Sequence, residues 1–274
     1  MLLVQAVAFL AALAGSEASL FNIFDIGSSL LPKFFKSPAQ TDITCPRDLV
    51  SCTRVGVDSC CSPSYGVVVL ALQWDLNMGP DQEFTIHGLW PNKCDGSFGP
   101  KNGCDPSRKL SDVSDVIYSS DRTIYDQAKK YWPSNRGDDN YFWTHEWNKH
   151  GTCVSTLNPK CYNQDSFKKG QDVVDYFSTT LKLAKRFNLY KALEAHGIVP
   201  TDPNSSKNLY TPQQFKSAIK AEFGVEANLR CVGNRLNEIF LYFNVRNKDD
   251  YFLVPPVGKD SCRKISYRKR TRRS

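Results

Sequence analysis

The chain has 274 residues, of which 41% are hydrophobic and 12% aromatic. This content is enough for a substantial buried core and excludes a disordered or fibrous protein. The formal net charge of +7 says little about the fold, because residues 263–274 hold seven basic residues and no acidic one, and the rest of the chain is balanced.

The N-terminus is typical of a signal peptide. Residues 2–14 are apolar but too few to span a bilayer, and the small residues Ser16 and Ala18 favour cleavage after Ala18. A buried N-terminal helix is the alternative. We expect a signal peptide at residues 1–18 and a propeptide or N-terminal arm at residues 19–44, where there are apolar patches but no cysteine.

The cysteines define the main body of the chain. All ten lie between Cys45 and Cys262, a density that favours an oxidising compartment. No repeat or low-complexity linker divides residues 45–262, so we expect one domain there. Residues 263–274 are expected to form a solvated basic tail, and contact with a polyanion or an anionic membrane is the alternative.

The cysteines and the N-terminal segment together predict the location of the protein. We expect it to be secreted, or kept in a vacuolar or endolysosomal compartment through the secretory pathway. Asn204, in Asn-Ser-Ser, is a candidate glycosylation acceptor and agrees with this route.

Four segments have the character of strands. Residues 65–74 are β-branched and apolar, as in a buried central strand. Residues 84–89 follow after a turn, which predicts an antiparallel pair. Residues 238–245 and 251–254 flank a turn of polar residues and predict a second hairpin.

Five segments have the character of helices. They cover residues 121–131, 140–150, 172–187, 189–195 and 211–224. The last begins at Thr211 with a capping residue, a proline and a glutamine in capping-box spacing, and Gly224 ends it. The elements together predict an α+β single domain, with a mostly antiparallel sheet packed against several helices.

Three of the four histidines lie in two aromatic-rich segments, FTIHGLWP at residues 84–91 and FWTHEWNKHG at residues 142–151. The second segment lies on a predicted helix, for which Asp138 and Asp139 are N-cap candidates and Gly151 is the C′ candidate. Trp143 and Trp147, four residues apart, are expected to bury one side of this helix.

Another side of the same helix presents Glu146, Lys149 and His150, which share a face by their spacing. An ion pair between Glu146 and His150 would contribute only about 0.3–0.5 kcal/mol. The set is better suited to chemistry at phosphorus, where an ammonium stabilises charge, one imidazole removes a proton and another protonates the leaving oxygen. His87, at the end of a predicted strand, is the expected second imidazole.

A metal site is the competing use of these residues. Three residues separate Glu146 from His150, where the zinc protease pattern has two. His145 and His150 are five positions apart, which is about 140° around a helix, so they do not face a single ion. We expect no metal and no cofactor.

The two segments resemble the active-site signatures of the ribonuclease T2 family, as HGLWP at residues 87–91 and FWTHEWNKHGTC at residues 142–153. The runs CCSP at 60–63 and YWPSN at 131–135 are most similar to the fungal branch, and the resemblance covers residues 45–262. It implies a metal-independent endoribonuclease that cleaves single-stranded RNA by transesterification to 2′,3′-cyclic phosphates, which are then hydrolysed to 3′-phosphates.

The resemblance also implies the role of each catalytic residue. His150 is the general base and His87 the general acid, and Glu146 and Lys149 stabilise the pentacoordinate phosphorane. His145 binds phosphate. One imidazole must start neutral and the other charged, so we expect a bell-shaped pH profile with an acidic to weakly acidic optimum.

Two base sites carry over in part. The implied base-binding residues are Gln73, Trp90, Asn92, Phe98, Pro133, Ser134, Asn135, Arg136 and Phe142. At Asn92, Phe98 and Arg136 the fungal pattern has aspartate, tyrosine and glutamine, so the base preference stays open. Plain core packing is the alternative for Trp90.

Ten cysteines permit many pairings, and spacing alone does not choose between them. The resemblance implies Cys45–Cys61, Cys52–Cys94, Cys60–Cys161, Cys104–Cys153 and Cys231–Cys262.

Two other classes of function stay open. The chain could be a catalytically silent secreted RNA- or glycan-binding protein on the same fold, although both His87 and His150 are present. It could also be a signalling or cytotoxic ligand in which cleavage is secondary. His196, which has no chemistry-bearing neighbour in sequence, is expected to be structural or solvated. We expect a monomer with RNA as its substrate.

Overall fold

The structure is a computed structural model that describes residues 44–202 and 209–271. The chain divides into two units, Met1–Thr41 and Asp42–Ser274, and all described residues belong to the second. The predicted signal peptide, residues 19–43 of the predicted arm, Asn204 and the last three residues of the predicted tail lie outside the described residues.

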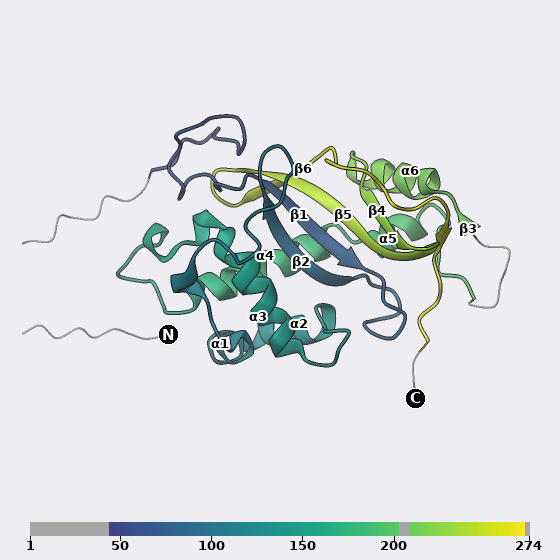
Figure 1. The fold of residues 1–274 in the computed structure, drawn as a ribbon, viewed down its shortest axis with the longest axis horizontal. Helices are drawn as coiled ribbons and strands as arrows, with labels where there is room; N and C mark the ends of the chain where they lie inside the picture. The colour runs from purple at the N-terminus through teal and green to yellow at the C-terminus, as the bar shows by residue number, and fades with distance from the viewer. Residues whose placement is uncertain (1–43, 203–208, 272–274) are drawn as a thin grey trace, which may run out of the picture. The chain divides into compact units, whose positions relative to one another are not determined.

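A seven-stranded sheet forms the centre of the described unit (Figure 1). The long strand β5 (Arg235–Arg246) pairs antiparallel with β1 (Val67–Gln73), and β1 pairs antiparallel with β2 (Thr85–Asn92). Two further antiparallel partners of β5 are β4 (Asn228–Val232) and β6 (Asp250–Val254). The two-residue strand β7 (Ile265–Ser266) runs parallel to β5 and pairs with β3 (Leu209–Tyr210).

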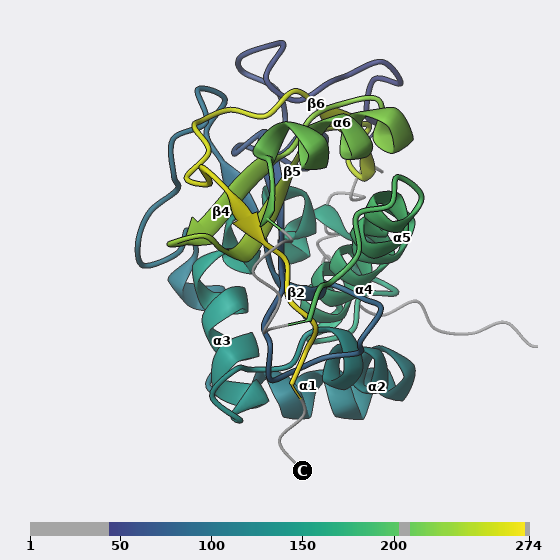
Figure 2. The ribbon, with the colours of Figure 1, turned by 90° about the vertical axis from the view of Figure 1, so that its right-hand side faces the viewer.

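Six α-helices lie in the described residues: α1 (Val113–Ser120), α2 (Arg122–Tyr131), α3 (Asp139–Lys149), α4 (Gln171–Arg186), α5 (Leu189–Glu194) and α6 (Pro212–Phe223). Short 3-10 turns cover Pro106–Arg108, Gly151–Cys153, Ser155–Leu157 and Pro159–Cys161. Helix α4 packs against β1 and β2, and the ring of Trp143 on α3 lies 6.0 Å from that of Phe177 on α4, so both helices cover the same core. Figure 2 shows α1, α2 and α3 at the opposite end of the view from α6.

Strand β1 is buried on both faces, as its continuous apolar run predicts. Leu70 and Leu72 belong to the main core under the helices. Val69 and Ala71 point to the opposite face and form a smaller cluster with Phe240 of β5. Trp90 of β2 packs against that second cluster, which therefore supports the sheet face that carries Trp90.

The predicted α+β fold is confirmed, and the segments predicted as strands and helices all form them within a few residues. The sequence interpretation omitted α1, β4 and the two-residue strands β3 and β7. The predicted C′ position of Gly151 is confirmed, although its backbone is not left-handed. His150 caps the helix, and Gly151 begins a 3-10 turn packed against the indole of Trp147.

The expectation of a solvated tail after Cys262 is wrong for most of its length. Residues 263–271, here called the C-terminal strap, cross the end of the sheet, with Ile265 and Tyr267 fully buried. The ring of Tyr267 lies 4.8 Å from that of Trp74, and the guanidinium of Arg270 lies 3.9 Å from the Trp74 ring. Apolar and aromatic side chains between the basic ones hold the strap, so the folded domain extends beyond residue 262.

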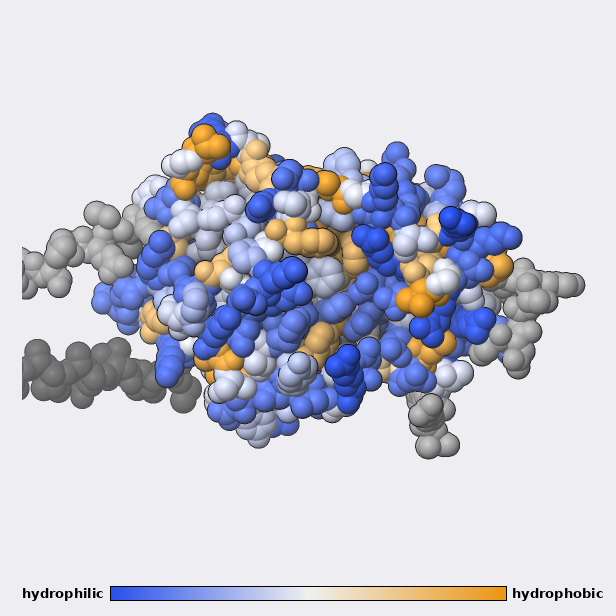
Figure 3. All heavy atoms as spheres, in the orientation of Figure 1, coloured by the Kyte–Doolittle hydropathy of each residue, from blue (hydrophilic) through white to orange (hydrophobic). Residues whose placement is uncertain are grey.

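The five disulfide bonds are the pairs that the resemblance implies: Cys45–Cys61, Cys52–Cys94, Cys60–Cys161, Cys104–Cys153 and Cys231–Cys262. The surface seen in Figure 3 is mostly hydrophilic, with small apolar patches scattered over it. Among the described residues, no helix has the length and apolar character needed to cross a bilayer.

Candidate active site

An irregularity in the sheet presents His87. Ala71 of β1 pairs with Gly88, but the next residue, Leu72, pairs with Ile86, so His87 is an extra residue in β2. Such a bulge bends the strand and re-aims the side chain of the extra residue. The carbonyl of His87 accepts a 2.8 Å hydrogen bond from Trp132 Nε1, which holds the bulge from the helical side.

Helix α3 carries the second set of side chains. It begins at Asp138, whose side chain accepts from the backbone N–H of Tyr141 at 2.9 Å. Trp143 and Trp147 are fully buried, as predicted, and their indole N–H groups donate to backbone carbonyls at 2.8 Å. The helix is thus fixed in position, and Glu146 on its buried side is only 1% exposed.

Gly88 allows the strand and the helix to approach each other. A Cβ added to Gly88 would overlap Glu146 Oε2 and Trp90 Nε1. These two atoms are joined by a hydrogen bond of 2.9 Å, in which the indole donates to the carboxyl. Any side chain at residue 88 would therefore displace Glu146.

The imidazoles of His87 and His150 both lie against the ring of Trp90. The ring of His87 lies 4.9 Å from the Trp90 ring, and the ring of His150 stacks on Trp90 at 5.3 Å. These separations place the two imidazole centres no more than about 10 Å apart. His87 Nε2 lies 3.8 Å from Glu146 Oε1, so the buried carboxyl stands on the side of His87 that faces α3.

His145 and Lys149 complete the cluster on α3. The ring of His145 lies 6.5 Å from that of His150. The half-buried ammonium of Lys149 is close enough that its charge lowers the pKa of His150 and of His145. The basic side chains of α3 are therefore gathered beside the imidazole of His150.

The two imidazoles have opposite electrostatic environments. Burial lowers the pKa of His150 from 6.5 to about 2, and the positive charge of Lys149 adds to this effect. Burial acts in the same direction on His87, but its contact with Glu238 and the charge of Glu146 outweigh burial and raise its pKa above 6.5. The surroundings thus favour the neutral form of His150 and the charged form of His87.

Glu146 is also perturbed. Burial raises the pKa of its carboxyl from 4.5 to about 7, although the charges of His87 and Lys149 and the Trp90 hydrogen bond oppose the rise. A carboxyl group so placed is neutral at acidic pH and able to act as a hydrogen-bond donor.

Glu238 is the residue at this site that the sequence interpretation missed. It lies on β5, about 90 residues after α3 in the chain, and its carboxylate contacts His87 Nδ1. Glu238, Phe240 and Tyr242 occupy every second position, which indicates that they share one face of a strand. Nothing in the sequence showed that this face also carries His87.

The predicted base-binding residues lie on both sides of the cluster. Phe142 is 5.7 Å from His87 between ring centres, and Gln73 Nε2 donates to the carbonyl of Ile86 at 3.1 Å. Asn92 is buried at the end of β2, and Phe98, in the loop that follows, is 76% exposed. Pro133, Ser134, Asn135 and Arg136 form the loop between α2 and α3, with Asn135 and Arg136 exposed. Their role in binding bases stays a prediction.

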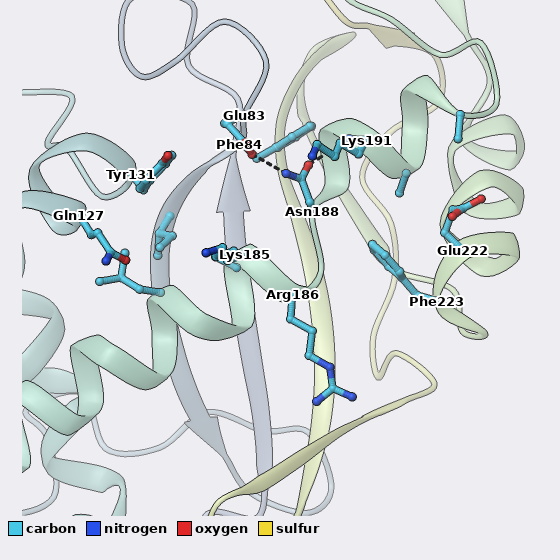
Figure 4. A pocket seen from close by; sticks show the side chains of 15 residues that line it. Glu83, Phe84, Gln127, Tyr131, Lys185, Arg186, Asn188, Lys191, Glu222 and Phe223 are labelled. Carbon is cyan, nitrogen blue, oxygen red and sulfur yellow. Dashed lines mark hydrogen bonds between the residues drawn. The ribbon is translucent and has the colours of Figure 1, made fainter. Parts of the chain in front are cut away.

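A pocket lies on the helical side of the sheet and is separate from this cluster (Figure 4). Its lining includes Phe84, Tyr131 and Lys185, and one wall is closed by a 2.8 Å hydrogen bond from Asn188 to Glu83. None of the predicted site residues lines it. Among the described residues, no group of three or more His, Cys, Asp or Glu side chains is arranged to hold a metal ion.

Comparisons with known proteins identify the family of the chain. The profile of the Ribonuclease T2 family matches residues 58–253. Ribonuclease Rh of Rhizopus niveus is 44% identical over 220 residues, covering 80% of this chain and 89% of that protein. Ribonuclease T2 of Aspergillus oryzae is 43% identical over 211 residues, covering 74% of each.

A solved structure gives the same result. The crystal structure of Actibind, a T2 ribonuclease, superposes with a TM-score of 0.76 at 32% sequence identity, covering 84% of this chain and 99% of that one. The matched residues 58–253 contain both histidine segments and Glu238. The chain therefore belongs to the ribonuclease T2 family and is most similar to its fungal members.

Proposed function

We propose that this ribonuclease cleaves single-stranded RNA by transesterification, with His150 as general base and His87 as general acid. The observation that supports this most is the opposite environment of the two imidazoles, which meet at one site from different elements. One has its pKa lowered to about 2 and the other has its pKa raised above 6.5.

The proton transfers follow from these environments. Neutral His150 removes the proton from the ribose 2′-hydroxyl, whose oxygen attacks the neighbouring phosphorus. Protonated His87 gives its proton to the departing 5′-oxygen, which leaves a 2′,3′-cyclic phosphate. In a second round, water takes the place of the 5′-hydroxyl, and the cyclic phosphate opens to a 3′-phosphate.

Charge at phosphorus is the other requirement of the reaction. Lys149 and His145 supply positive charge on the α3 side, where the phosphate oxygens gain negative charge. Glu146, protonated at acidic pH, donates a hydrogen bond to one of those oxygens. The attacking oxygen belongs to the substrate itself, so the mechanism needs no metal, and DNA, which lacks the 2′-hydroxyl, is not cleaved.

Base binding is proposed on the two flanks of the cluster. Exposed and half-buried rings at Trp90, Phe98 and Phe142 offer stacking surfaces, each worth roughly 1–3 kcal/mol to a bound base. Gln73 and the polar residues of the loop 133–136 offer hydrogen bonds to a base. Asn92 both donates and accepts, where an aspartate would only accept.

We also propose that the protein passes through the secretory pathway as a monomer, with a cleaved signal peptide and a glycan on Asn204. The five disulfides support an oxidising destination. Secretion and vacuolar retention are distinguished by fractionating cells of the source organism and assaying culture medium against vacuoles.

Dinucleoside monophosphates test the proposal when digested in EDTA and analysed by chromatography. We expect cyclic phosphates first and 3′-phosphates later, and no product when the 2′-hydroxyl is replaced by hydrogen. His87→Ala or His150→Ala should each slow cleavage by about 100- to 10,000-fold. His196→Gln is the control and should cleave normally, because His196 pairs with Glu222 on the surface. Folded protein that cleaves nothing would favour the catalytically silent binding protein.

A further inference from the structure

His87 has a carboxylate neighbour that neither histidine segment contains. Its Nδ1 is hydrogen-bonded to Glu238 Oε1, whereas its Nε2 lies 3.8 Å from Glu146 Oε1. We propose that Glu238 is a positioning residue that holds the Nδ1–H of His87, so that the imidazolium stays charged and Nε2 carries the proton that is transferred. This inference rests on the proposed function, which gives His87 its task.

The sheet fixes Glu238 beside the bulge. Glu238 is on the central strand β5, where it pairs with Gln73 of β1 on one side and with Arg230 of β4 on the other. Its side chain is 14% exposed, against 34% for His87. Phe240, two residues further along the same face, contacts the Trp90 ring at 5.4 Å. Glu238 therefore reaches His87 from the sheet, opposite to the approach of Glu146 from α3.

The two nitrogens of His87 consequently have different tasks. A histidine nitrogen that is held by a carboxylate determines which nitrogen is free to exchange a proton. Here Nδ1 is occupied by Glu238, and Nε2 points to the side where Glu146 and the α3 cations stand. Rotation of the ring by half a turn would break the Glu238 contact, so the free nitrogen stays on the substrate side.

The charges around His87 show why Glu238 is needed. From α3, the positive charge of Lys149 lowers the pKa of His87, and His145 and His150 interact with it electrostatically. The other nearby carboxyl, Glu146, has its pKa raised to about 7 by burial. The charge of Glu146 also raises the pKa of His87, but this charge is lost as Glu146 is protonated below about pH 7. The direct hydrogen bond to His87 comes from Glu238.

A purely structural role is the alternative, in which the ion pair only ties the bulge to β5. Both roles predict a loss of activity when Glu238 is replaced. Only the positioning role predicts a change in the pH at which activity falls. That pH is set by the acid form of His87, so losing the carboxylate moves the alkaline limb of kcat/KM to lower pH.

The experiment compares pH profiles of kcat/KM on a dinucleoside monophosphate for wild type, Glu238→Gln and Glu238→Asp. We expect the alkaline limb of Glu238→Gln to move to lower pH and the acidic limb to stay in place. At pH values above the limb, kcat/KM should fall about tenfold for each pH unit by which the limb moves. Glu238→Asp, which keeps the charge, should recover most of the wild-type profile. Glu222→Gln is the control, because it removes a surface carboxylate that lies 3.0 Å from His196. Its pH profile should match that of wild type.

A direct titration keeps the inference testable if the glutamine variant does not fold. Nitrogen NMR of the wild-type imidazoles should show His87 with its proton on Nδ1 in the neutral form, and Glu238→Asp should retain this tautomer. A neutral form with the proton on Nε2 would overturn the inference, as would identical alkaline limbs for wild type and Glu238→Gln. Wild-type protein that leaves RNA intact would instead refute the proposed function.

Discussion

The buried carboxyl of Glu146 makes the folded protein favour low pH. Burial raises its pKa from 4.5 to about 7, and each unit corresponds to about 1.4 kcal/mol, so the proton contributes roughly 3 kcal/mol to folding. Because the folded pKa lies above the unfolded one, this contribution is fully present below about pH 4.5 and is lost as the pH rises through about 7. Glu146→Gln, which does not titrate, should remove this part of the pH dependence.

The comparison is cleanest in a His87→Gln background, because the charge of His87 interacts with Glu146 and itself depends on pH. The charge of His87 lowers the pKa of Glu146, so its removal leaves the shift at least as large. The assay is guanidinium unfolding with the disulfides intact, followed by tryptophan fluorescence at pH 4 and pH 8. Relative to Glu146→Gln, the protein with Glu146 should lose about 3 kcal/mol between these pH values. Equal pH dependence in the two proteins would refute the reasoning, and Glu222→Gln serves as the exposed control.

Three further predictions concern the approach of strand and helix, the C-terminal strap and the pH window. Gly88→Ala should lower cleavage at least about 100-fold while the protein still folds, because its Cβ would displace Glu146. Gly99→Ala is the control and should cleave at the wild-type rate, because a Cβ there makes only ordinary van der Waals contacts. Normal activity in Gly88→Ala would contradict the assigned role of Glu146. Removal of residues 264–274 should destabilise the domain by about 3–5 kcal/mol, measured by urea unfolding, because it deletes the buried ring of Tyr267. Lys269→Ala, at an exposed position of the strap, should cost little. Equal stabilities would show that the strap is not part of the fold. Activity should persist well into the acidic range, because the pKa of His150 is lowered to about 2. It should fall as the pH rises past the raised pKa of His87. A loss of activity on the acidic side near pH 6 would argue against His150 as the base.

The parts of the fold that local signals determine were predictable from the sequence. The capping box at Thr211 begins α6, and Asp138 caps α3. The apolar run of β1 forms the buried strand that it predicts. Strand β4 was missed because Asn228–Val232 holds Arg230 and Cys231 and has no alternation of its own. Its conformation comes from pairing with β5, which local sequence does not reveal.

The strap and the site show the same limit. A run of basic residues predicts a solvated end, yet Ile265 and Tyr267 supply the buried contacts that hold this segment, and tertiary packing outweighs its charge. The candidate catalytic residues on α3 could be grouped from their spacing alone, because a helix fixes which side chains share a face. Glu238 could not be joined to His87 in this way, since their contact depends on a bulge in β2 and on strand order.

The assignment of acid and base is tested most directly with a dinucleotide in which sulfur replaces the 5′-oxygen of the leaving nucleoside. A thiolate leaves without being protonated, because the pKa of a thiol is near 8.5, so the step assigned to His87 is no longer needed. We expect His87→Ala to cleave this substrate at close to the wild-type rate and His150→Ala to remain slow by about 100-fold or more. Rescue of His150→Ala with no rescue of His87→Ala would contradict the account.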